Sequence, residues 1–268
     1  MSTRPVESEF VMPSLRLDGR VALVTGGGRG LGLGMALALA HAGADVAIAA
    51  RTPGQVDQAT ALVSGLDRRT LGLPTDVTDD DAPQRLVDAV LGHFGRLDVL
   101  VHAAGINIRK PALDLSPAEV DRVLRVNVHA PFRLSQAAAP TMKSQGRGRI
   151  IAVTSVSSEV AIPRVSAYAM SKGALRQMVR ALAVEWARDG ITVNAIAPGR
   201  FWTAMTDAIF SDERLHAGAV RVIPMGRPGV AADLAGATVL LASDASAYIT
   251  GQTIVIDGGW LAGGGVEG

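Results

Sequence analysis

Residues 20–34 read RVALVTGGGRGLGLG, so a short apolar run passes directly into a cluster of glycines. The run at 20–25 is typical of a strand that is buried on both faces of a parallel sheet. A helical pattern, MALALAHAG, follows at 35–43. In a strand, glycine turn and helix, the backbone can approach a pyrophosphate closely, and the helix N-terminus offers free N–H groups. This context predicts a dinucleotide-binding site.

Strand and helix patterns alternate along the rest of the chain. Further strands are predicted at 45–50, 69–74, 97–105, 150–154, 191–199 and 253–259. This alternation implies right-handed crossovers and the α/β class, with a Rossmann-type doubly wound parallel sheet flanked by helices on both faces. We assign residues 17–268 to this single domain. Residues 1–16, which contain Pro5 and Pro13, are predicted to be an N-terminal extension.

Composition excludes several classes of protein. The 268 residues are 48% hydrophobic and contain no cysteine, so disulfides, zinc–thiolate sites and cysteine nucleophiles are excluded. A net charge of +1 gives no electrostatic reason to expect a nucleic acid or an anionic membrane as partner. No stretch approaches ~18 uninterrupted apolar residues, and no signal peptide is visible. We therefore predict a cytoplasmic protein with a small-molecule substrate.

Candidate residues for acid/base catalysis lie within residues 155–172, SVSSEVAIPRVSAYAMSK, which run from the end of a predicted strand into a predicted helix. Tyr168 and Lys172 are four residues apart, so their side chains share one helix face. A Tyr hydroxyl has a pKa near ~10. A lysine ammonium roughly 5 Å away favours the phenolate by about 3 kcal/mol at an effective dielectric of ~20, which lowers the pKa by roughly 2. Tyr168 then becomes useful as a general acid or base, and Ser155 offers a second hydroxyl.

This arrangement resembles the short-chain dehydrogenase/reductase family, which pairs Tyr-x-x-x-Lys with a serine at this spacing. The glycine turn matches the TGxxxGxG pattern of the same family at Thr25, Gly26, Gly30 and Gly32. The resemblance covers residues 15–260 and implies hydride transfer between a ketone and a secondary alcohol.

The resemblance also implies roles for single residues. Tyr168 is the general acid/base, Ser155 donates a hydrogen bond to the substrate oxygen, and Lys172 lowers the Tyr168 pKa and holds the nicotinamide ribose. Asn127, in RVNVHAP, anchors a proton relay. Further cofactor contacts are implied at Asp76, Val77, Ala104, Gly105, Pro198, Gly199 and Thr203.

One departure from the family pattern precedes the cofactor contacts after the fourth strand. The chain has His102 and Ala103 where the family usually has two asparagines. We expect His102 to be a packed substitute, not a catalytic residue, and the Ala104–Gly105 backbone contact to survive.

The end of the second strand bears on the choice of cofactor. An acid at this point selects NAD in dinucleotide-binding folds, but the chain has Ala50 followed by Arg51. Arg29 stands inside the glycine turn. Two guanidiniums suit a 2′-phosphate, so NADP(H) is expected to be preferred, with use of NAD(H) left open. The alternative is that both arginines are simply solvated loop residues.

Two stretches, 105–116 and 181–201, resemble the gluconate 5-dehydrogenase branch of the family, which implies a sugar acid or polyol as substrate. Alternatives are a 3-oxoacyl-carrier-protein reductase, another ketone reductase, or a non-catalytic nucleotide-binding protein. In the carrier-protein enzymes an Arg often precedes the helix Glu, whereas here Val184 precedes Glu185. Arg109, helped by Arg164, is predicted to pair with a substrate carboxylate, although both could be solvated loop residues.

The remaining expectations concern metals, the lid and assembly. The five histidines show no ligand spacing, so no metal site is expected. Residues 200–225 are expected to form a lid over the substrate. The family resemblance implies a homotetramer. Met178, Leu182 and Trp186 recur at four-residue steps, which suits either a core face or a subunit face.

Overall fold

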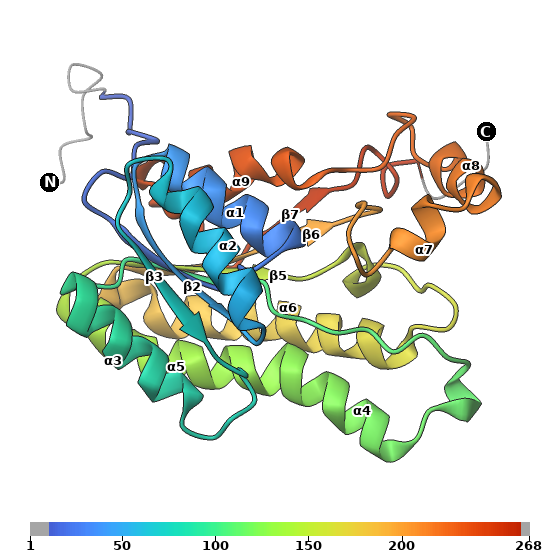
Figure 1. Ribbon diagram of the computed structural model, residues 1–268, viewed down its shortest axis with the longest axis horizontal. Coiled ribbons are helices and arrows are strands. Elements are labelled where there is room, and N and C mark those ends of the chain that lie inside the picture. The colour runs from blue at the N-terminus through green and yellow to red at the C-terminus, as the bar shows by residue number, and fades with distance from the viewer. Residues whose placement is uncertain (1–10, 264–268) are drawn as a thin grey trace, which may run out of the picture.

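The computed structural model describes residues 11–263 and is built on one parallel sheet (Figure 1). The seven strands run in the order β3-β2-β1-β4-β5-β6-β7. Their bounds are β1 Val21–Thr25, β2 Asp45–Ala50, β3 Thr70–Pro74, β4 Val99–His102, β5 Gly148–Val153, β6 Ile191–Pro198 and β7 Thr253–Ile256. The order reverses between β1 and β4, and this switch point opens a crevice beyond the carboxyl ends of the strands.

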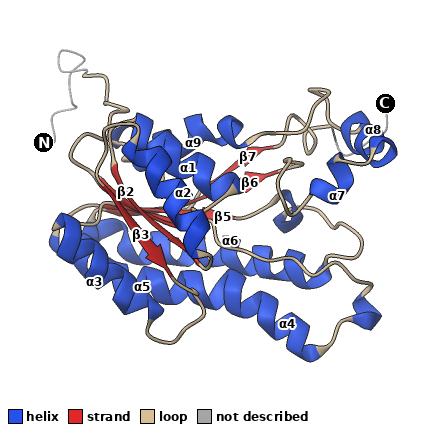
Figure 2. Ribbon diagram, viewed as in Figure 1, coloured by secondary structure: helices blue, strands red, loops and turns tan. Residues whose placement is uncertain are grey.

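Helices cover both faces of the sheet (Figure 1, Figure 2). One face carries α1 Gly30–His41, α2 Pro53–Ser64 and α9 Ala235–Ala242. The other carries α3 Ala82–Phe94, α4 Pro117–Leu124, α5 Ala130–Ser144 and α6 Ser166–Trp186. Two short helices, α7 Asp207–Phe210 and α8 Glu213–Arg221, follow β6 and lie beyond its carboxyl end. The predicted doubly wound fold is confirmed.

Each face of the sheet has its own apolar core, because successive strand residues point to opposite faces. In β1, Leu23 belongs to the core under α5 and α6, whereas Val24 belongs to the core under α1 and α9. Both side chains are fully buried, which explains why the strand sequences are continuous apolar runs. Leu182 and Trp186 are also buried against the first of these cores, with Met178 packed beside them, so this helix stripe faces the core.

The helical segment after Ser116 is interrupted. It begins with a reciprocal capping box, which Ser116 and Glu119 form at the start of α4. A π-helical turn over Arg125–His129 then separates α4 from α5. Sequence periodicity did not indicate this turn.

Most of the predicted N-terminal extension, residues 1–10, lies outside the described residues, as do residues 264–268. Residues 11–16 have no regular secondary structure and are exposed. Among the described helices, none is both long and apolar enough to span a membrane.

Candidate active site

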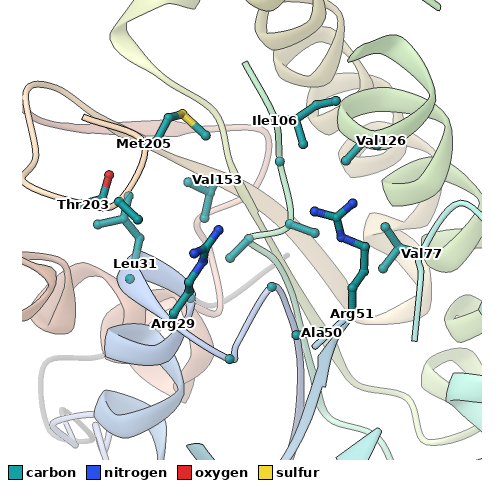
Figure 3. Close-up of a pocket in the computed structure, with 18 of the residues that line it drawn as sticks. Arg29, Leu31, Ala50, Arg51, Val77, Ile106, Val126, Val153, Thr203 and Met205 are labelled. Atoms are coloured by element: carbon teal, nitrogen blue, oxygen red, sulfur yellow. The ribbon is translucent and has the colours of Figure 1, made fainter. Parts of the chain in front are cut away.

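A cavity of about 300 Å³ lies at the carboxyl ends of the central strands, at the switch point (Figure 3). Its wall is formed by the glycine turn, by the segments after β2, β3, β4 and β6, and by the start of α6. These segments are far apart in sequence, and the parallel topology brings them to one edge.

The glycine turn lies at the base of this cavity and requires its glycines for steric reasons. Gly26 has φ +70, and a Cβ there would lie 2.6 Å from the backbone nitrogen of Ala104. A Cβ on Gly32 would lie 2.2 Å from the carbonyl oxygen of Gly26. Gly30 also has a positive φ, +57. The hydroxyl of Thr25 donates to the carbonyl of Val101 over 3.2 Å and ties β1 to β4.

The N-terminus of α1 opens toward the cavity without a side-chain cap. Its N-cap residue is Arg29, whose side chain accepts no hydrogen bond from the first helical turn. The first N–H groups of α1 therefore stay available to an anion. This cradle fits the pyrophosphate of a dinucleotide.

Arg29 and Arg51 are both exposed residues of the cavity lining (Figure 3). Figure 3 shows both side chains extending from the floor into the same space. Arg51 also acts on Asp76, whose pKa lies below its ordinary value. Burial of Asp76 opposes this shift, but hydrogen bonds from Thr78 and the charge of Arg51 outweigh it. β2 ends without an acidic residue, so no carboxylate there would repel a 2′-phosphate.

Ser155, Tyr168 and Lys172 all line this cavity. Ser155 follows β5 directly, and its hydroxyl accepts a hydrogen bond from the Ser157 backbone nitrogen over 3.1 Å. The Lys172 Nζ lies 5.5 Å from the centroid of the Tyr168 ring.

The expected lowering of the Tyr168 pKa is wrong for this structure. Burial raises the pKa of Tyr168, and a hydrogen bond with Ser155 only partly opposes that rise. The prediction from sequence counted only the charge of Lys172, whereas removing a phenolate from water is unfavourable and raises the pKa. Tyr168 is therefore a neutral phenol here.

Lys172 is buried and makes its own hydrogen bond to the sheet. Its Nζ donates to the carbonyl of Val153 over 2.7 Å. Burial lowers the pKa of Lys172 to about 8. The cavity thus holds an amine whose protonation changes near neutral pH.

Asn127 lies in the π-helical turn and is fully buried. Its Oδ1 accepts from the Ile106 backbone nitrogen, and its Nδ2 donates to the Ile106 carbonyl and to the Ser171 hydroxyl, each over 2.9 Å. The side chain therefore braces the segment after β4 against α6. Ser171 is a positioning partner that the sequence reasoning missed, since a serine inside a helix carries no distinguishing signal.

His102 is a packed residue, as expected. Its Nε2 lies 2.8 Å from the Ser135 hydroxyl, and Ser135 in turn donates to the carbonyl of Pro131. Complete burial lowers the pKa of His102 to about 3, so the ring stays neutral. The pair connects β4 to α5 where the family pattern has an asparagine.

The other sequence-derived contacts divide into two groups. The cavity is lined by Asp76, Val77, Ala104, Gly105, Pro198, Gly199 and Thr203. Arg109 and Arg164 are exposed and lie outside the lining. The backbone nitrogen of Lys110 donates to the Arg164 carbonyl over 3.0 Å, which joins the loops after β4 and β5. Within residues 11–263, no cluster of potential metal ligands is found.

Comparison with known proteins gives consistent matches. The family described as Enoyl-(Acyl carrier protein) reductase matches residues 26–261. Gluconate 5-dehydrogenase of Gluconobacter oxydans (strain 621H) is 39% identical over 246 residues, covering 91% of this chain and 95% of that protein. The 2-dehydro-3-deoxy-D-gluconate 5-dehydrogenase of Escherichia coli (strain K12) is 42% identical over 256 residues, covering 94% of this chain and 100% of that protein.

A solved structure matches over a similar extent. It is a gluconate 5-dehydrogenase from Burkholderia cenocepacia J2315 in complex with NADP and tartrate. It is 36% identical, with a TM-score of 0.89, and the match covers 94% of this chain and 98% of that chain.

Proposed function

This chain belongs to the short-chain dehydrogenase/reductase family, and we propose that it interconverts a ketone and a secondary alcohol on a sugar acid with NADP(H). The observation that carries the proposal is that Ser155, Tyr168 and Lys172 share one cavity with the glycine turn. The curated relatives that act on gluconate and on 2-dehydro-3-deoxy-D-gluconate support the substrate class.

The cavity residues fit a dinucleotide. The turn at Gly26–Gly32 and the uncapped start of α1 would hold the pyrophosphate, and Arg29 and Arg51 would hold the 2′-phosphate. Asp76 and Val77 would contact the adenine, and the backbone of Ala104 and Gly105 would contact the cofactor. Thr203, which follows Pro198 and Gly199, would bind the nicotinamide carboxamide, and Tyr168 and Lys172 would bind the nicotinamide ribose. When bound, the cofactor supplies or accepts the hydride.

The protein supplies the proton and the position of the reacting carbon. In ketone reduction, Tyr168 donates its proton to the substrate oxygen while Ser155 donates a hydrogen bond to the same atom. Its raised pKa keeps Tyr168 protonated and ready for this step. Lys172 holds positive charge beside the ring, and Asn127 anchors the relay that returns a proton to the site. Oxidation reverses these transfers.

Turnover with matched substrates tests the proposal. The purified protein should reduce NADP⁺ to NADPH when gluconate is added. It should oxidise NADPH when a ketogluconate is added. Tyr168→Phe is the matched control, because it keeps the ring and removes only the hydroxyl. Absence of turnover across a panel of sugar acids, polyols and ketones would refute the enzymatic proposal.

A second candidate is reduction of a thioester-linked acyl group, which the name of the matching family favours. Against it, the exposed Val184 stands on α6 where an Arg would meet an acidic carrier protein. A 3-oxoacyl thioester and a 2-enoyl thioester in the same assay separate the two candidates. Faster turnover of either thioester than of gluconate would favour the second candidate.

We also propose a cytoplasmic homotetramer, in which residues 200–225 close over the substrate. The proposal is supported by large apolar side chains exposed on α5, on α6 and on the edge strand β7, namely Phe132, Met170, Val184 and Val255. The lack of cysteine agrees with a reducing compartment. Light scattering at micromolar concentration should give about four times the chain mass of 27.7 kDa. A monomeric mass would contradict the assembly.

A further inference from the structure

Arg200 is fixed by its neighbours but carries an unpaired guanidinium. It follows β6 directly after Gly199 and precedes Phe201, both of which line the cavity. Its Cζ lies 5.2 Å from the centroid of the Trp260 ring, a contact in which the ring face attracts the cation. Its Nε is buried and has no hydrogen-bond partner among the described residues. The side chain is therefore positioned without being neutralised.

The platform under Arg200 is a tight turn after β7. Asp257 accepts hydrogen bonds from the backbone nitrogens of Gly259 and Leu261, over 2.9 and 2.8 Å. Gly258 and Gly259 both have positive φ, which lets the chain fold back over Asp257. These bonds hold Trp260 in place, so the position of the Arg200 guanidinium is set by a braced ring.

A second guanidinium lies near the first. Burial lowers the pKa of Arg200, and the positive charge of Arg109 lowers it further, so the two groups repel each other. Neither side chain forms an ion pair with an acid in the part of the chain that the structure describes. Lys110, the residue after Arg109, is by contrast paired with Glu119. Glu119 thus neutralises the charge of Lys110, whereas the charges of Arg109 and Arg200 have no acidic partner among the described residues.

Most of the other partly buried arginines among the described residues have acidic partners, whereas Arg68 donates to the carbonyl of Gly43. Arg147 contacts Asp244 over 3.0 Å, and Arg176 contacts Glu159 over 2.9 Å. A partly buried guanidinium without a counter-ion is unfavourable, so Arg200, with the exposed Arg109 near it, points to an anionic ligand. A carboxylate suits the pair because its two oxygens match the planar guanidinium fork.

We propose that Arg200, together with Arg109, binds the carboxylate of the substrate and determines the preference for acids over neutral polyols. The proposal rests on the proposed function, whose reacting group lies at Ser155 and Tyr168 in the same cavity. In this proposal Arg200 replaces Arg164, which the sequence analysis predicted as the second arginine of the carboxylate site. Arg164 is exposed and has a left-handed backbone with φ +68, whereas Arg200 is half-buried over the Trp260 ring and lies in the chain between two residues that line the cavity.

Matched substrates measure this preference. D-gluconate and D-glucitol differ by a carboxylate against a hydroxymethyl group, and kcat/KM for both is compared in the wild type, Arg200→Gln, Arg200→Lys and Trp260→Phe. Arg188→Gln, an exposed arginine beyond the end of α6, is the control. Arg200→Gln should lower kcat/KM for gluconate by about ten- to a hundred-fold, mainly through KM, and leave glucitol nearly unchanged. Arg200→Lys and Trp260→Phe should give smaller losses of the same kind.

The outcomes separate this inference from the proposed function. Equal losses on gluconate and glucitol, or a retained acid preference in Arg200→Gln, would overturn the inference while leaving the function intact. If the wild type ignores gluconate, the same variants are compared on other keto acids and their neutral analogues. An acid preference that disappears in Arg200→Gln would then support the inference and refute the sugar acid. No acid preference in the wild type would overturn it.

Discussion

The Nζ of Lys172 donates a hydrogen bond to the backbone carbonyl of Val153 over 2.7 Å, which attaches the first turns of α6 to the end of β5. The bond fixes the amine beside the Tyr168 ring, at 5.5 Å from its centroid. It also keeps the amine away from water, and this burial lowers the pKa of Lys172 to about 8. One contact therefore positions this lysine and makes its charge sensitive to pH.

The Lys172 pKa has a consequence for stability. The folded value of about 8 is below the unfolded value near ~10.4, so the unfolded chain binds more protons between these values. The free energy of unfolding should therefore rise with pH across this window, by at most about 3 kcal/mol from this group. Urea unfolding of the wild type and of Lys172→Met between about pH 7 and 10 measures the difference. Parallel pH profiles for the two proteins would contradict the prediction.

Tyr168→Phe should abolish turnover while NADPH still binds. The ring remains packed, and only the hydroxyl that transfers the proton is lost, so a fall in kcat of at least about a hundred-fold is expected. Fluorescence titration with NADPH and the urea midpoint serve as controls for binding and folding. Activity within about ten-fold of the wild type would remove Tyr168 from the role of general acid.

Some of this site was predictable from sequence and some was not. The glycine turn, Ser155, Tyr168 and Lys172 were predictable because short-range spacing sets their positions at element ends. The π-helical turn around Asn127 was not, because one extra residue in a turn barely changes a hydrophobic pattern. The rise of the Tyr168 pKa was missed because burial depends on tertiary packing. The contact of Arg200 with Trp260 likewise joins segments that only the sheet brings together.

Arg51→Ala should weaken NADP(H) binding and leave NAD(H) binding nearly unchanged. Loss of charged hydrogen bonds to the 2′-phosphate is expected to raise the NADP(H) Kd about ten- to a hundred-fold. Arg29→Ala should act in the same direction, and Arg188→Ala provides a control on an exposed arginine. Isothermal titration with both cofactors measures the ratio. A native enzyme that binds the two cofactors equally well would show that these arginines do not select the phosphate.

At the opposite end of the sheet, Asp98 is fully buried and lies beside several arginines. Its carboxylate receives two hydrogen bonds from Arg96, each over 2.7 Å, and one from the Val21 backbone nitrogen over 3.0 Å. Burial opposes ionisation of Asp98, but these bonds and the charges of Arg96 and Arg147 outweigh it, so its pKa is lowered. The stability that this carboxylate contributes is therefore complete above about pH 4 and lost as the pH falls through the folded pKa.

Asp98→Asn should accordingly destabilise the protein by about 1–3 kcal/mol at neutral pH, because the buried side chain loses its charged hydrogen bonds while the partly exposed Arg96 can still be solvated. Its urea midpoint should also fall less on acidification than that of the wild type, since the titrating carboxylate is gone. Asp18→Asn is the matched control, because Asp18 pairs with Arg16 at an exposed site, where water screens the two charges and the pair adds little stability. If both variants lost the same small amount of stability, the buried cluster would be no more important than a surface ion pair.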